Sequence, residues 1–208
     1  MLFRDRLDGA IRLAEKLHAY RGKNPLVLAI PRGAVTMAKH IAAELDGEVD
    51  VVLVRKIGAP HNPEFAIGAV DESGNYFVGE DASLTGADDN YITREKQKQI
   101  EIMRERRAHY TPSRTPADPA GRIVIVVDDG LATGSTMMAA LRALRTTNPA
   151  QLICAVPVAP PDTLEKVARY CDETVCVHAT PDFFAVGQFY ADFPQVSDEE
   201  VVEILQGR

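Results

Sequence analysis

Two adjacent carboxylates, Asp128 and Asp129, follow the most apolar run of the chain, Ile123–Val127. Continuous β-branched residues of this kind are typical of a parallel strand that is buried on both faces. In open α/β sheets, ligands bind beyond the carboxyl ends of the strands. Carboxylates repel a phosphate, but they accept hydrogen bonds from hydroxyl groups, attract cations and stabilise developing positive charge. The pair therefore predicts a polar site at this edge of the sheet.

Small residues follow the acidic pair and lead into a predicted helix. They are Gly130, Leu131, Ala132, Thr133, Gly134, Ser135 and Thr136. Small side chains let the backbone approach a ligand, and the free N–H groups and dipole of a helix N-terminus favour a phosphate. A ligand that carries a phosphate next to a sugar diol would satisfy both halves of the segment. The alternative is an ordinary α/β loop in which the acidic residues cap the helix, but capping accounts for only one of the two.

The remaining sequence supplies alternating strands and helices that position this segment. We expect strands at Leu26–Ile30, Val49–Val54, Phe65–Val70, Tyr76–Val78, Ile123–Val127, Leu152–Val156 and Thr174–Val177. Helices are expected at about 2–20, 34–45, 88–109, 135–145, 161–170 and 197–205. This alternation predicts an α/β fold with an open, mostly parallel sheet and helices on both faces. We expect a single domain over residues 1–208, with a core at about 26–177 and a small C-terminal hood and helix at about 178–208.

The segment Val124–Thr136, VIVVDDGLATGST, resembles the phosphoribosyl pyrophosphate (PRPP) signature of the type I phosphoribosyltransferases. That signature is an apolar strand, two acidic residues, a few small or apolar residues and then T-G-x-T. The resemblance implies that Asp128 and Asp129 contact the ribose hydroxyls and Mg²⁺, the metal through PRPP or water. It also implies that Gly130–Thr136 bind PRPP, with Ala132–Thr136 around its 5-phosphate.

A second segment, Pro31-Arg32-Gly33, lies between a predicted strand and a predicted helix. It resembles the pyrophosphate loop of the same family, which often contains an unusual cis peptide bond. The resemblance implies that Arg32 grips the leaving group through its planar fork and that Gly33 permits close approach of the backbone. The alternative is a turn with an exposed arginine.

Two basic residues, Arg55 and Lys56, open a stretch at 55–62 that we expect to be irregular, because it contains a glycine and a proline and is followed at once by Pro63. The stretch resembles the family's mobile loop, which closes over PRPP and carries basic groups to the pyrophosphate. The alternative is a solvated basic pair at a strand end. Within or next to this loop, His61 is a candidate ligand or base and Glu64 a candidate general base.

Aromatic side chains gather near the C-terminus of a chain with only 6% aromatic residues. In the resembled family a variable hood recognises the acceptor base, so Phe183, Phe184 and Tyr190 are candidates for stacking on a flat heterocycle. These rings could equally form the core of the hood. Ala132 stands where enzymes acting on 6-oxopurines carry an Asp, so the loop is closer to the adenine-type pattern.

The function implied by the resemblance is that of a pentosyltransferase, an Mg²⁺-dependent enzyme of nucleotide metabolism. It would move ribose 5-phosphate from PRPP to a nitrogenous base and release pyrophosphate. Asp128, Asp129, Arg32 and Lys56 are the candidate catalytic residues, and Arg55 would bind phosphate. One alternative is a regulatory protein that senses PRPP without turnover, and another is hydrolysis of a phosphosugar at the same site.

Composition excludes several other classes. The net charge of −7 argues against non-specific nucleic-acid binding, which depends on surplus Lys and Arg. No apolar run approaches the length of a membrane span, and the three cysteines form no C-x-x-C pair. We therefore expect a cytoplasmic protein with small-molecule substrates and no nucleic-acid or membrane partner. A homodimeric state is a separate expectation.

Overall fold

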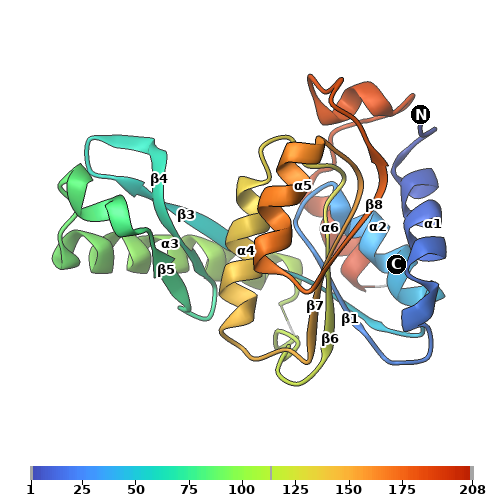
Figure 1. Ribbon diagram of the computed structural model, residues 1–208. Helices are drawn as coiled ribbons and strands as arrows, with labels where there is room; N and C mark the ends of the chain where they lie inside the picture. The colour runs from blue at the N-terminus through green and yellow to red at the C-terminus, as the bar shows by residue number, and fades with distance from the viewer. Residues whose placement is uncertain (1, 113, 207–208) are drawn as a thin grey trace.

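A five-stranded parallel sheet forms the centre of the computed structural model, which describes residues 2–112 and 114–206 apart from the side chains of Glu64, Glu80 and Asp81 (Figure 1). The strand order is β2-β1-β6-β7-β8, and each neighbouring pair is parallel. The strands are β1 (Leu26–Ala29), β2 (Glu48–Val51), β6 (Ile123–Val127), β7 (Gln151–Ala159) and β8 (Glu173–Ala179). The predicted fold class is confirmed.

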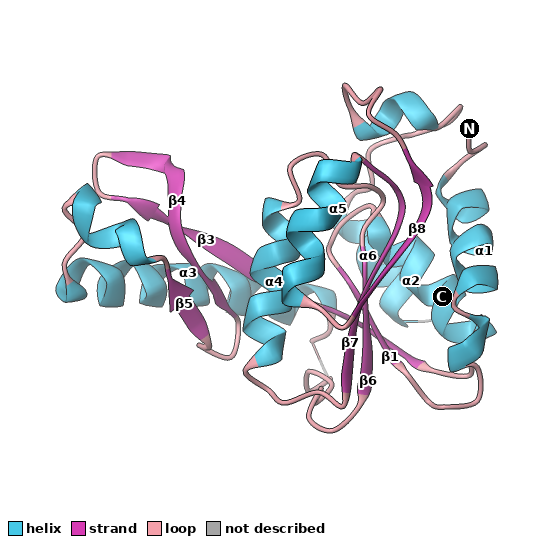
Figure 2. Ribbon diagram, in the orientation of Figure 1, coloured by secondary structure: helices cyan, strands magenta, loops and turns pink. Residues whose placement is uncertain are grey.

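Helices cover both faces of this sheet (Figure 2). One face packs against α1 (Arg6–Lys16), α2 (Ala34–Glu44) and α6 (Asp198–Gln206), and the other packs against α4 (Ser135–Arg145) and α5 (Pro161–Val167). Successive residues of β6 alternate between the two cores, with Ile125 on the first and Val126 on the second. Burial on both faces explains why β6 is apolar at every position.

A three-stranded antiparallel arm projects away from the main sheet (Figure 1). It consists of β3 (Val54–Ala59), β4 (Asn62–Asp71) and β5 (Tyr76–Val78), with the long helix α3 (Asp89–Tyr110) alongside. The last two strands pair across the Asp71–Asn75 turn, with Val70 opposite Tyr76.

Two predictions for the start of this arm are wrong. The strand predicted at Val49–Val54 is interrupted after Val51, and the stretch at 55–62 is not an irregular loop but most of a β-hairpin. Its prolines do not break the pairing, because Pro60 lies in the two-residue turn and Pro63 lies at a register shift. Gly58 makes that irregularity possible, since an added Cβ there would overlap the carbonyl of Pro63.

Both ends of the chain build the hood over the carboxyl edge of the sheet. Phe3 pairs with Tyr190, its N–H donates to the Phe189 carbonyl at 2.7 Å, and its carbonyl accepts from the Ala191 N–H at 2.8 Å. A capping box opens the last helix, where Ser197 and Glu200 form reciprocal side-chain-to-backbone hydrogen bonds. Within the described parts of the chain, no helix has the length and apolar character needed to cross a membrane.

Candidate functional site

A cleft of about 500 Å³ lies where β1 and β6 end, between the Pro31–Gly33 turn and the hood. Its lining residues are Arg6, Ile30, Pro31, Arg32, Gly33, Asp128, Asp129, Thr136, Phe193, Pro194, Gln195 and Val196. The parallel pairing of Ala29 with Val127 places the residues that follow both strands at the same edge. The structure thus brings the predicted acidic pair together with Arg32, Gly33 and Thr136.

The two carboxylates have different surroundings. Asp128 Oδ1 accepts a hydrogen bond of 2.9 Å from the Asp129 backbone N–H, while Asp129 Oδ2 lies 2.9 Å from Nε of Arg6. Burial, reinforced by the charge of Asp129, raises the pKa of Asp128 well above its ordinary value, although the Asp129 N–H and the Arg6 charge oppose the rise. Arg6 thus compensates the charge of Asp129 directly, while Asp128 is bound by backbone.

Arg6 is a site residue that the sequence analysis missed. Its Nη1 donates to the Pro194 carbonyl at 2.7 Å, and its guanidinium lies 3.8 Å from the ring centre of Phe193. A signal was present in the sequence: Arg6 is the first residue of α1, where the helix dipole disfavours a cation. A basic residue at that position implies an acidic partner outside the helix.

The small-residue loop makes a tight turn into α4. Gly134 has a φ of +71°, and an added Cβ would lie 2.9 Å from Thr163 Cγ2, so both backbone conformation and space favour glycine. Thr163 also ties the loop to α5, because its hydroxyl donates to the Ala132 carbonyl at 2.9 Å. Ala132, Thr133 and Thr136 are exposed, so the loop presents its surface to solvent at the N-terminus of α4.

Gly130 and Leu131 anchor the start of the same loop. The Leu131 N–H donates to the Val158 carbonyl at 3.0 Å, and the Leu131 side chain is buried. An added Cβ at Gly130 would lie 2.7 Å from Val186 of the hood. These two residues pack rather than face the cleft, and Ser135 hydrogen-bonds within the loop to Thr133, with 3.1 Å between their hydroxyl oxygens.

The turn before α2 brings backbone directly against the acidic pair. The Pro31–Arg32 peptide bond is cis, as the family resemblance implied. An added Cβ at Gly33 would overlap Oδ2 of Asp129 and lie 2.8 Å from Nε of Arg6. Arg32 itself lines the cleft and lies 3.9 Å from the Asp198 carboxylate at the start of α6.

The two basic residues of the arm lie outside this cleft. Arg55 hydrogen-bonds to Gln99 of α3 and lines a small adjoining cavity with Pro31, Thr136 and Arg106. Lys56 is exposed and lines another cavity, of about 580 Å³, between the hairpin and α3. The structure therefore does not bring Lys56 to the acidic pair, because β3 carries it out along the arm. His61 lies at the hairpin turn, and the Glu64 side chain is outside the described residues.

The aromatic residues of the hood form a small core, the second of the two alternatives. Tyr190 is buried, with its ring stacked 4.8 Å from Phe193 and 5.3 Å from Phe3. Its hydroxyl donates to the Asp129 carbonyl at 2.6 Å, so this ring supports the site and is not free to stack on a base. Phe183 packs against Phe189 at 5.1 Å.

Phe184 differs from these rings because it is 94% exposed. Of the three predicted base-stacking residues, it is therefore the one whose ring faces solvent.

A resident metal centre built only from protein groups is not supported. Among the described residues, no group of three or more His, Cys, Asp or Glu side chains could hold a metal ion. Mg²⁺ retains several waters and binds through one or two carboxylates together with substrate phosphates. The two carboxylates at the cleft fit that arrangement, in which the ligand supplies the remaining oxygen atoms.

Known proteins are similar to this chain in sequence and in fold. A family model described as the phosphoribosyl transferase domain matches residues 3–194. A Mycobacterium tuberculosis protein, provisionally named a phosphoribosyl transferase, is 39% identical over 205 residues, which cover 98% of this chain and 46% of that protein. The chain thus spans about half the length of the curated relatives that it matches.

Solved structures give the same fold. A Thermus thermophilus protein of known crystal structure is 44% identical, with a TM-score of 0.91 and coverage of 100% of this chain and 99% of that one. A Neisseria gonorrhoeae protein crystallised with bound ppGpp has a TM-score of 0.50 at 15% identity and covers 100% of this chain and 97% of its own, which is a likeness of fold alone.

Proposed function

The chain belongs to the phosphoribosyl transferase family, and we propose that it transfers ribose 5-phosphate from PRPP to a nitrogen atom of a heterocyclic base, releasing pyrophosphate. The observation that carries this proposal is the meeting of Asp128 and Asp129 with the Ala132–Thr136 loop at one edge of the sheet. Carboxylates suit a diol and a developing positive charge, and the helix N-terminus beside them suits a phosphate.

We assign each end of PRPP to one part of this site. The 5-phosphate would lie over the exposed loop residues at the start of α4, and the ribose hydroxyls would face the two carboxylates. As the bond to pyrophosphate breaks, positive charge develops on the ribose ring, and the negative Asp129 stabilises it. Arg32, which also lines the cleft, would bind the departing pyrophosphate through its guanidinium.

Mg²⁺ would enter with PRPP, and when bound it neutralises charge on the pyrophosphate. Asp128 and Asp129 are the protein groups that would hold it, through water or the ribose oxygens. The acceptor would approach from the hood side, where Phe184 offers an exposed ring. A cytoplasmic location and a homodimeric state complete the proposal.

The test is pyrophosphate release by the purified protein with Mg²⁺ and PRPP, with and without a pool of purine and pyrimidine bases. Release that requires the pool establishes transfer, and dividing the pool identifies the acceptor. Release without any base indicates hydrolysis. The absence of both pyrophosphate release and PRPP binding would refute the proposed function.

A PRPP sensor without turnover is the second candidate. The position of Lys56 favours the sensor. Because β3 carries Lys56 away from the cleft, Arg32 would bind the leaving group without this predicted partner. Magnesium-dependent binding of PRPP measured by calorimetry, without release of pyrophosphate for any base in the pool, would identify the sensor.

Gly33→Ala should lower kcat/KM for PRPP on the order of 100-fold, because the new methyl group displaces the Asp129 carboxylate and ångström-scale misplacement has effects of that size. Gly79→Ala is the control, since an added Cβ at that arm position meets only an ordinary contact of 3.6 Å. Steady-state kinetics of both variants test the prediction, and unchanged kinetics in Gly33→Ala would show that close packing on Asp129 is unimportant.

Arg32→Ala should raise the KM for PRPP about 10-fold or more, since a charge-assisted hydrogen bond contributes about 1.5–3 kcal/mol. Arg21→Ala serves as the control, because Arg21 also forms a loose ion pair, 3.6 Å from Asp46, on another face of the protein. Equal KM values for Arg32→Ala and the wild type would assign the Pro31–Gly33 turn a purely structural role.

A further inference from the structure

Arg6 connects three parts of the site. Its Nε contacts Oδ2 of Asp129 at 2.9 Å, its Nη1 donates to the Pro194 carbonyl at 2.7 Å, and its planar face covers the ring of Phe193. The side chains of Arg6 and Asp129 are only 12% and 17% exposed. Low exposure weakens solvent screening, so this ion pair is stronger and better defined than one on the surface.

The surroundings leave the Asp129 carboxylate little freedom. Gly33 packs against both Oδ2 and Nε of Arg6, and the Tyr190 hydroxyl holds the Asp129 carbonyl at 2.6 Å. A carboxylate can accept about four hydrogen bonds. The contact with Arg6 therefore fixes the orientation of the carboxylate and still leaves acceptor capacity for a sugar hydroxyl.

The position of Arg6 in α1 indicates that this residue does not stabilise the helix itself. The first turn of a helix favours negative charge, and Asp5 already caps this one by accepting the Asp8 N–H at 2.8 Å. A cation at the first helical position is unfavourable unless a nearby anion compensates it. Asp129, which is 123 positions away in the sequence, is that anion.

From this geometry we propose that Arg6 is a positioning residue, which orients the Asp129 carboxylate toward the ribose and ties it to the hood segment Phe193–Pro194. The inference rests on the proposed function and deepens it. One guanidinium thus binds both the carboxylate and the hood, and it links the hood to the ribose site although the two lie far apart in the sequence.

The experiment compares Arg6→Gln, Arg6→Lys and the control Arg12→Gln, which breaks an ion pair of the same length, 2.9 Å to Asp8, elsewhere on α1. For each protein we would measure kcat and KM for PRPP, the PRPP dissociation constant with Mg²⁺ and the melting temperature. Arg6→Gln should lower kcat/KM about 10- to 100-fold, the range for loss of a charge-assisted hydrogen bond. Arg12→Gln should lower only the melting temperature.

Rescue by the conservative variant separates positioning from simple structural support. A purely structural role would lower the melting temperature and leave the kinetics of the folded protein unchanged, whereas loss of the contact between Arg6 and Asp129 should lower kcat/KM at temperatures where the variant is folded. Arg6→Lys should restore the charge but only part of kcat/KM, because an ammonium lacks the planar fork that makes three contacts.

The outcomes are distinguishable. If the wild-type protein binds or converts PRPP and the Arg6→Gln variant has the same kinetic and dissociation constants, this inference alone would be overturned. If the wild type binds PRPP without turnover, a 10- to 100-fold weaker dissociation constant in Arg6→Gln supports it. A wild type that neither binds nor converts PRPP would refute the proposed function and this inference together.

Discussion

We expect Asp129→Asn to remove most of the turnover while leaving the fold intact. The amide has the same shape as the carboxylate, and its oxygen can still accept the hydrogen bond from Arg6. What is lost is the negative charge that stabilises the positive ribose ring as pyrophosphate departs. Loss of a single preorganised electrostatic group reduces kcat about 100- to 1,000-fold. Pyrophosphate release at saturating PRPP and base measures this effect.

Asp118→Asn is the matched control for that variant. Asp118 is an exposed residue before β6 whose carboxylate accepts a hydrogen bond from the nearby Ala120 N–H, at 3.0 Å. Its substitution removes the same charge from the protein without touching the cleft, so kcat should not change. Comparable losses in the two variants, or full activity of Asp129→Asn, would remove Asp129 from the proposed mechanism.

The parts of the site that could be predicted from sequence are local in the chain. β6, the acidic pair, the loop and α4 follow one another within residues 123–145, and the bounds of β6 and α4 were predicted without error. A strand that is buried on both faces requires a continuous apolar run, and a tight loop of the phosphate-binding type requires small residues. Both features are properties of neighbouring residues, which a single sequence displays.

The parts that could not be predicted depend on contacts between distant residues. Arg6 meets Asp129 only because the sheet topology places α1 beside the end of β6. Similarly, Tyr190 is as compatible with stacking on a ligand as with packing until its neighbours Phe3 and Phe193 are known. The β3–β4 hairpin was mistaken for a loop because prolines usually end strands, and only the register places them at a turn and a bulge.

Other differences concern where elements end. β7 continues through Pro157 to Ala159, three residues beyond the predicted end. Its partner β8 accounts for the extra length, since His178 pairs with Val158 and Ala179 with Ala159. Strand ends are set by the partner strand, so a single-strand pattern underestimates them.

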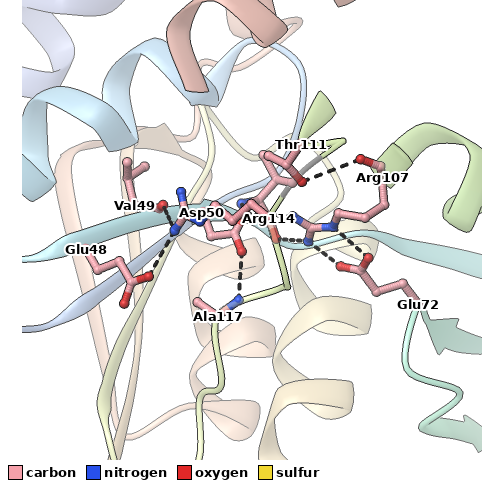
Figure 3. A network of polar contacts seen from close by, with 9 residues as sticks. Glu48, Val49, Asp50, Glu72, Arg107, Thr111, Arg114 and Ala117 are labelled. Atoms are coloured by element: carbon pink, nitrogen blue, oxygen red, sulfur yellow. Dashed lines mark hydrogen bonds and ion pairs between the residues drawn. The ribbon is translucent and has the colours of Figure 1, made fainter. Parts of the chain in front are cut away.

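A buried ion network joins the arm to the main sheet (Figure 3). Arg107 of α3 contacts Asp50 of β2 at 2.6 Å, donates to the Val51 carbonyl at 2.8 Å and binds both oxygens of Glu72. Asp50 is 1% exposed and also accepts the Ala117 N–H at 2.9 Å. The neighbour of Arg107 in α3, Arg106, lines the small cavity beside Pro31, so the network also determines how the arm approaches the cleft.

Arg107→Gln should destabilise the protein by about 3–5 kcal/mol, because it leaves Asp50 as a buried charge without its compensating partner. Equilibrium urea denaturation measures the free energy of unfolding. Arg104→Gln, an exposed position one turn earlier on α3, provides the control and should change stability by less than about 0.5 kcal/mol.

The double variant Arg107→Gln/Asp50→Asn tests the cause of the loss. The double variant no longer has an uncompensated charge at position 50. It should therefore lose less stability than the sum of the losses in the two single variants, as expected for groups in direct contact. Strict additivity, or a loss below about 1 kcal/mol in Arg107→Gln, would mean that solvent already screens the network like a surface ion pair. Because the arm depends on this contact, Arg107→Gln should also weaken protection of α3 amides from hydrogen exchange before it affects those of β6.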